Sequence, residues 1–302
     1  MEPIIAASNL TKRFRRVLAV DGLDLTVERG EVFGFLGPNG AGKSTTLRMM
    51  VGLIKPSRGK IQLFGRDVWR EHCQALRKVG AMIESPAFYK YLSGRDNLRI
   101  FYNTGANCTV RQIDEALDTV GLLKRANDKV KSYSQGMRQR LGIALAIIGS
   151  PELVLLDEPT NGLDPQGMKE VRDLIISLSR DRNLTVFLSS HLLHEVEQIC
   201  TRIAVVNKGR VIETGSVSDL LKRSETYDVH AHPSEAAAEA IRGIPGASID
   251  ATLDGMFKVK LASGTPAELN KCLVDKGIAV SALIPRVASL EELYLRLMDE
   301  QC

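Results

Sequence analysis

Four short, continuously apolar segments alternate with helical patterns through the first two thirds of the chain. The segments that predict buried strands are residues 31–36, 153–156, 185–188 and 203–206, of which the first and third are apolar after an initial Glu31 and Thr185. The intervening helical patterns cover residues 45–50, 168–179 and 192–199. Strands that are apolar throughout and separated by helices are typical of a mostly parallel sheet with both faces covered. The pattern therefore predicts an α/β core.

The stretch between these strands has a different pattern. Apolar residues recur at helical spacing around Asp114 to Leu122, and a longer helix is expected from Gln135 to Ile148. We assign residues 1–222 to one domain, with a helical subdomain at about residues 85–148.

Residues 223–302 predict a second, smaller α+β domain. Its pattern reads strand, helix, strand, strand, helix, strand and a final helix, an order that suggests a ferredoxin-like unit. Two of its helix starts carry capping boxes, one from Thr265 to Glu268 and one from Ser289 to Glu292. No cluster of ionisable residues in this part indicates a chemistry.

Composition narrows the class of protein. The 302 residues are 44% hydrophobic and 25% charged with a net charge of +4, which is typical of a soluble globular protein. The dense basic run Lys12 to Arg16 is interpreted as a solvated edge rather than a nucleic-acid patch, so no nucleic-acid partner is expected. The apolar run from Leu141 to Gly149 is shorter than the ~20 residues of a membrane span, and no secretory signal opens the chain. Five scattered cysteines favour a reducing compartment.

The segment from Gly37 to Ser44 fits the phosphate-binding pattern G-x-x-x-x-G-K-[ST] between a predicted strand and a predicted helix. Lys43 is expected to reach the β- and γ-phosphates, and the Ser44 hydroxyl is expected to ligate Mg²⁺. The positive end of the helix favours an anion here. The predicted phosphate-binding residues are Gly37, Pro38, Asn39, Gly40, Ala41, Gly42, Lys43, Ser44 and Thr45.

A second apolar strand, Leu153 to Leu156, ends in two carboxylates. Asp157 is expected at the carboxyl edge of the sheet beside the phosphate loop, where it can hold Mg²⁺ through water. Glu158 follows it and is expected to polarise the attacking water.

Together these motifs resemble those of the ATP-binding cassette (ABC) ATPases, over about residues 4 to 222. The resemblance continues in Ser134 to Arg140, which is similar to the signature LSGGQ-x-x-R, in the D-loop Asn161 to Asp164, and in the switch histidine His191. It implies a P-loop NTPase ABC cassette with a mixed sheet core and a helical subdomain. Lys43, Glu158 and His191 would then be the catalytic residues of an ATPase.

The resemblance also implies a partner. In this family two ATP molecules lie between two subunits, each held by the phosphate loop of one and the signature of the other. Ser134 and Gly136 would therefore contact the γ-phosphate bound by a second copy of the chain or by a paralogous cassette. His191 would contact the γ-phosphate and the D-loop across that interface.

Two of the candidate residues have an alternative interpretation. His191 and His194 superficially suggest a zinc helix, but the order H-E-x-x-H and a third ligand are missing. Phe14 is expected to stack on adenine, with a core aromatic as the alternative. Val20 is expected to flank the base.

Two positions depart from the family pattern. Glu84 stands where the family usually has the Q-loop glutamine, and it is expected to offer an oxygen to Mg²⁺ while adding charge beside Asp157 and Glu158. Because an amide offers the same oxygen, Glu84→Gln is expected to retain ATPase activity, and loss of activity in a folded variant would show that the charge is needed. Gln135 and Met137 stand where the family signature commonly has glycine and glutamine, but Ser134 and Gly136 are kept, so the γ-phosphate contact is expected to be retained.

One cassette per chain, and about ninety residues without heptads between Ser44 and Ser134, favour the energising subunit of a transporter over a DNA-repair or translation factor. Phe88, Tyr89 and Tyr91 are expected to form a docking groove for a permease, although core packing explains such aromatics equally well. The sequences of residues 83–94 and 133–146 resemble those of the bacitracin-resistance and antibiotic-export class.

That class implies a separately encoded transmembrane permease, export of a drug, peptide or lipid-like compound, and a location at the cytoplasmic face of the cell membrane. Import stays open. The competing hypothesis is a soluble ABC ATPase that acts on nucleic acid or ribosomes.

Overall fold

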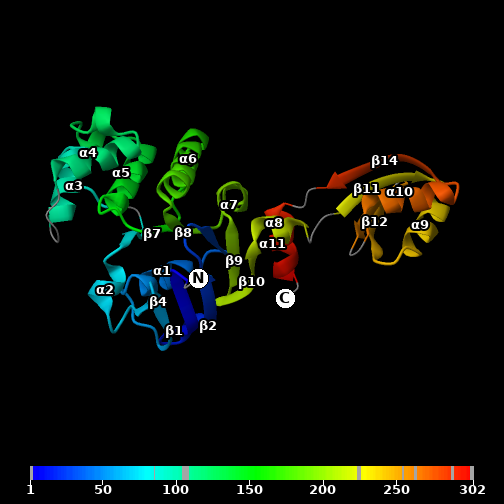
Figure 1. Ribbon diagram of the computed structural model, residues 1–302, viewed down its shortest axis with the longest axis horizontal. Helices are drawn as coiled ribbons and strands as arrows, with labels where there is room; N and C mark the ends of the chain where they lie inside the picture. The colour runs from blue at the N-terminus through cyan, green and yellow to red at the C-terminus, as the bar shows by residue number, and fades with distance from the viewer. Residues whose placement is uncertain are drawn as a thin grey trace. The chain divides into compact units, whose positions relative to one another are not determined.

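The computed structural model describes residues 3–84, 86–103, 109–222, 226–253, 255–261, 264–286 and 289–299 (Figure 1). The chain divides into two compact units, residues 1–215 and 216–302. The boundaries expected at residues 85 and 223 fall outside the described residues.

A six-stranded sheet forms the centre of the first unit. In spatial order its strands are β10 (Arg210–Ser216), β9 (Arg202–Asn207), β3 (Val32–Leu36), β8 (Thr185–Ser190), β7 (Leu153–Asp157) and β6 (Val79–Met82). Neighbours from β9 to β6 pair in parallel, and β3, β7 and β8 are buried along their whole length. The predicted parallel core is confirmed.

The register of this sheet brings distant loops together. Leu36 at the end of β3 lies opposite Ser190 of β8 and Val205 of β9. Leu156 of β7 lies opposite Met82 of β6. The loops that follow these strands therefore leave the sheet at one carboxyl edge, which is where ligands bind in open α/β sheets.

A second, four-stranded sheet packs against the first through one helix. Its strands, in spatial order, are β2 (Val17–Val27), β1 (Ile5–Phe14), β4 (Arg58–Leu63) and β5 (Arg66–Asp67). Helix α1 (Lys43–Met50) lies between the two sheets, and its Leu47, Met49 and Met50 share one buried core with residues of both. This burial on two sides holds the start of α1 at the edge of the parallel sheet.

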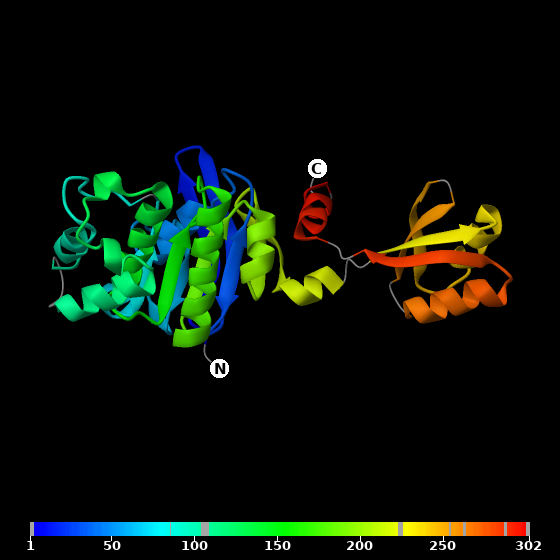
Figure 2. The same cartoon turned by 90° about the horizontal axis from the view of Figure 1, so that it is seen from above.

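Other helices cover the opposite face of the parallel sheet (Figures 1 and 2). These are α5 (Gln135–Ile147), α6 (Pro165–Arg182) and α7 (Leu193–Ile199). The remaining helices of this unit are α2 (His72–Leu76), α3 (Gly94–Asn103), α4 (Val110–Thr119) and the 3₁₀ turns at Leu123–Arg125 and Val130–Ser132. Helix α4 begins four residues before the expected Asp114, because Thr109 and Gln112 form a capping box that the pattern analysis missed.

The second unit contains an antiparallel sheet in the order β12-β13-β11-β14. Its elements are α8 (Val217–Lys222), β11 (Thr226–His232), α9 (Ser234–Arg242), β12 (Ala247–Leu253), β13 (Met256–Leu261), α10 (Pro266–Asp275), β14 (Ala279–Arg286) and α11 (Leu290–Asp299). This strand order is that of a ferredoxin-like sheet. Val229, Phe257 and Leu273 are buried in its core, and α11 packs against α8.

The cysteines form no disulfide in the described part of the chain, where Cys73, Cys200 and Cys272 are free thiols. Burial raises the pKa of the Cys200 thiol, so it stays protonated. Cys108 and Cys302 lie outside the described residues. No helix within those residues combines the length and apolarity needed to cross a bilayer.

Candidate functional site

A cavity of about 470 Å³ opens at the carboxyl edge of the parallel sheet. The residues that line it are Val17, Leu18, Ala19, Pro38, Asn39, Gly40, Gly42, Lys43, Ser44, Thr45, Glu158, Asn161 and Lys208. They include the whole predicted phosphate loop except Gly37 and Ala41. The volume and the lining suit a phosphate-bearing ligand.

The loop is shaped by two close backbone approaches that only glycine permits. A Cβ on Gly37 would lie 2.3 Å from the carbonyl oxygen of Val206, and a Cβ on Gly42 would lie 2.3 Å from that of Ala19. Gly42 also has φ +98° and caps α1, so the first N–H groups of that helix follow it directly. Unpaired N–H groups at a helix start attract an anion.

Gly42→Ala is expected to weaken ATP binding at least ~10-fold more than Gly40→Ala. Both positions have positive φ, so both variants bear the ~1–2 kcal/mol backbone strain of a left-handed residue. A Cβ on Gly40 meets nothing within 4 Å, whereas one on Gly42 collides with Ala19. Titration with a fluorescent ATP analogue measures the difference. Equal affinities would contradict the close approach described above.

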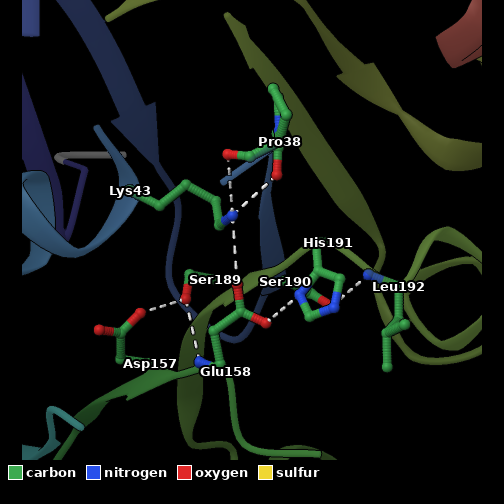
Figure 3. A network of polar contacts seen from close by, with 9 residues as sticks. Pro38, Lys43, Asp157, Glu158, Ser189, Ser190, His191 and Leu192 are labelled. Carbon is green, nitrogen blue, oxygen red and sulfur yellow. Dashed lines mark hydrogen bonds and ion pairs between the residues drawn. The ribbon is translucent and has the colours of Figure 1, made fainter. Parts of the chain in front are cut away.

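Three charged or ionisable side chains meet at the mouth of the loop (Figure 3). Lys43 Nζ donates to the carbonyl oxygens of Gly37 (2.7 Å) and Pro38 (3.3 Å) and lies 3.1 Å from Glu158 Oε1. The other carboxylate oxygen of Glu158 lies 2.6 Å from His191 Nδ1. Glu158 thus bridges the lysine of the phosphate loop and the predicted switch histidine.

Ser189, near the end of β8, contacts the carboxylate of Asp157 and the backbone of Glu158 (Figure 3). Its hydroxyl donates to Asp157 Oδ1 at 2.5 Å and accepts from the Glu158 backbone N–H at 3.0 Å. Glu158 itself has φ +50°, a conformation that costs free energy in residues other than glycine. Together these contacts direct Glu158 toward Lys43 and keep Asp157 buried in the sheet edge.

A smaller cavity of about 250 Å³ lies beside the first and is lined by Glu84, Gln139, Asp157, Glu158 and Asn161. Glu158 and Asn161 line both cavities. With Ser44 on the first cavity, the available donors are a hydroxyl and carboxylates, which are the hard oxygen ligands that Mg²⁺ prefers. The donor chemistry therefore fits the metal that the sequence predicts.

Ser134 and Gly136, the two signature residues expected to contact a γ-phosphate, do not line either cavity. Ser134 caps α5, where its hydroxyl accepts from the backbone N–H of Met137 at 3.2 Å. A Cβ on Gly136 would make only ordinary contacts, the nearest at 3.8 Å from the Cα of Gly167, and Ser134 itself is exposed. The start of α5 is thus available to a group from outside this chain.

The structure differs for the two residues, Phe14 and Val20, that are expected to contact the adenine base. Phe14 is 42% exposed, which excludes a core role, and Lys12 Nζ lies 4.9 Å from its ring centroid. Phe14 is nevertheless not part of the cavity lining. Val20 is fully buried in the core, so the expectation that it flanks the base is wrong. Val17, Leu18 and Ala19 line the cavity instead.

Sequence reasoning also missed Lys208, Asn161 and Gln139 as lining residues. A signal existed for Lys208, because it follows the apolar strand β9 directly and so must lie at the carboxyl edge of the sheet.

The zinc alternative for His191 and His194 finds no support: nowhere in the described ranges do three histidine, cysteine or acidic side chains gather as metal ligands.

Comparison with known proteins agrees with this geometry. A family model for the ABC transporter matches residues 20–161. The chain is 40% identical over 300 residues to the uncharacterized ABC transporter ATP-binding protein YhcH of Bacillus subtilis (strain 168), covering 99% of this chain and 97% of that protein. It is 39% identical over 300 residues to the bacitracin transport ATP-binding protein BcrA of Bacillus licheniformis, covering 99% and 98%.

Among solved structures, cbiO1 from Clostridium perfringens, part of the ABC transporter complex cbiONQ, has a TM-score of 0.67. Its sequence is 24% identical, and the superposition covers 81% of this chain and 97% of that one. This likeness concerns the fold.

Proposed function

The chain belongs to the ABC transporter family as an ATP-binding subunit, and from that premise we propose that it hydrolyses ATP to drive export through a separate permease. The observation that carries the proposal is the contact of Glu158 with both Lys43 and His191 at the mouth of the phosphate loop. The contacts support the proposal because the three residues, with the proposed roles of base, phosphate-binding cation and γ-phosphate sensor, form one hydrogen-bonded group.

In the proposed reaction, the γ-phosphate of ATP replaces Glu158 as the partner of Lys43. The Lys43 side chain is 6% exposed, so its charge acts on the phosphate with little screening from water. The released Glu158 carboxylate then accepts a proton from the water that attacks the γ-phosphorus, and the bond from this phosphorus to the β–γ bridging oxygen breaks, so that ADP and phosphate are the products. His191 orients the Glu158 carboxylate through its Nδ1 contact. Ser189 keeps the Glu158 backbone in place throughout.

Ser44, Asp157 and Glu84 are the residues that would hold Mg²⁺. The ion, when bound, neutralises charge on the β- and γ-phosphates. Asp157 is suited to this role because its carboxylate is buried and its direction is set by Ser189.

We infer that a second copy of the chain completes each site. The start of α5, where Ser134 is exposed, presents a helix N-terminus and a hydroxyl that do not line the cavity of their own chain. The γ-phosphate bound by one copy would meet this surface on the other.

An aromatic cluster, formed by Phe88, Tyr89, Tyr91 and Phe101, is the proposed docking surface for the permease. Phe101 contacts Phe88 edge-on at 6.0 Å and stacks on Tyr89 at 5.9 Å between ring centroids. Tyr91 is 67% exposed and Tyr89 is 44% exposed, so the cluster is not simply core packing. Exposed aromatic groups with polar rims are typical of protein interfaces. This docking places the chain at the cytoplasmic face of the membrane.

The likeness to a bacitracin transport protein suggests a peptide antibiotic as cargo. Deletion of the gene is expected to lower the minimal inhibitory concentration of bacitracin, and the wild-type gene is expected to restore it. A Lys43→Ala gene is expected to fail, because the variant lacks the phosphate-binding cation. Equal restoration by both genes, or no effect of the deletion, would contradict ATP-driven export of this antibiotic.

A further inference from the structure

Glu84 lies just beyond β6, at the rim of the smaller cavity, with its backbone at φ +67°. Its carboxylate forms an ion pair with the guanidinium group of Arg48. Arg48 belongs to α1 and follows Ser44 by four residues, so the side chains of Arg48 and Ser44 lie on the same face of that helix. The pair thus joins the phosphate-loop helix to the loop after β6.

The charges around this cavity explain why such a pair matters. Three carboxylates, Glu84, Asp157 and Glu158, line a volume of about 250 Å³ next to the expected phosphates. Glu158 has Lys43 as its cation, and Asp157 accepts from a neutral hydroxyl. Arg48 is the cation that faces Glu84. Like charges at such separations repel strongly unless a counter-ion is close.

We propose that Arg48 is a positioning residue for Glu84. It holds the carboxylate at the rim of the cavity and neutralises it, so that the extra negative charge of this position does not repel the incoming nucleotide. The role rests on the proposed function, since it presupposes ATP in the adjoining cavity. Arg48 is 33% exposed and Glu84 is 64% exposed, so water also screens the pair and the effect is moderate.

The proposal has a distinctive consequence for nucleotide binding without metal. In EDTA, Arg48 is the cation that pairs with Glu84 among the described residues, whereas added Mg²⁺ supplies a second cation near the same carboxylate. Arg48→Ala is therefore expected to weaken binding of a fluorescent ATP analogue about threefold to fivefold in EDTA and less in Mg²⁺, in line with a partly exposed ion pair.

A double-mutant cycle separates this role from a general contribution of Arg48 to α1. In the Glu84→Gln background, which has no charge to neutralise, Arg48→Ala is expected to change the affinity in EDTA less than twofold. Arg48→Lys keeps the charge and is expected to bind nearly as the parent chain does. Arg66→Ala, which removes an exposed surface pair with Glu71, is the matched control and is expected to change nothing.

Three outcomes would overturn the proposal. The first is an equal loss for Arg48→Ala with and without Glu84→Gln, which would assign Arg48 to the helix alone. The second is unchanged affinity of Arg48→Ala in EDTA. The third is failure of the parent chain itself to bind the ATP analogue in Mg²⁺, which would overturn the proposed function and this role with it.

Discussion

Glu158→Gln is expected to lower the rate of ATP hydrolysis by about 10²–10⁴-fold, the usual contribution of a general base. The amide has nearly the same shape as the carboxylate but cannot accept a proton from water. It also cannot form the 3.1 Å ion pair with Lys43, so the γ-phosphate no longer competes with a carboxylate for the ammonium group. ATP should therefore bind at least as tightly to the variant and remain intact in the site.

Phosphate release and the amount of bound ATP after desalting measure the two effects. Glu115→Gln is a suitable control, because this carboxylate pairs with Arg111 on an exposed helix surface away from the cavities. A Glu158→Gln variant that hydrolyses ATP at the parental rate would remove Glu158 from its assigned role.

Ser134→Asp is expected to abolish hydrolysis while leaving the ATP affinity of the single chain within about twofold. Aspartate caps helices as well as serine does, so α5 and the fold should be preserved. The new negative charge, however, would face the γ-phosphate held by the second copy. Loss of an oxyanion contact alone costs roughly 10²–10³-fold in rate, and repulsion adds to that.

Ser134→Asn is the matched control, since asparagine also caps the helix but carries no charge. Its activity is expected to exceed that of Ser134→Asp clearly. A different result is decisive: if Ser134→Asp weakens ATP binding by the isolated chain, the start of α5 belongs to the cavity of its own chain, contrary to the lining observed.

Much of the architecture was predictable because it depends on local pattern. Apolar strands such as Leu153 to Leu156 can only be buried, and their parallel pairing brings Asp157 and the end of β3 to one edge. The phosphate loop follows from its glycines, whose close backbone contacts leave no room for a Cβ. For these parts, sequence spacing and three-dimensional position are directly linked.

Other features depend on register and packing that spacing does not encode. Irregular pairing between β1 and β2, with shifts near Leu10 and Lys12, decides which residues of β2 face the cavity. For this reason Val20 is buried while Ala19 lines the site. The Arg48–Glu84 pair joins residues 36 positions apart, and it exists because α1 packs beside the loop after β6.

In the proposed mechanism, each nucleotide site is completed by a second copy of the chain. The most direct test is the molar mass of Glu158→Gln in solution with saturating ATP, measured by light scattering after gel filtration. We predict twice the 33.1 kDa of one chain, with two ATP per dimer, and a return to 33.1 kDa with ATP still bound when Ser134→Asp is added. An ATP-saturated Glu158→Gln that stays at 33.1 kDa, or a double variant that dimerises equally well, would contradict the claim.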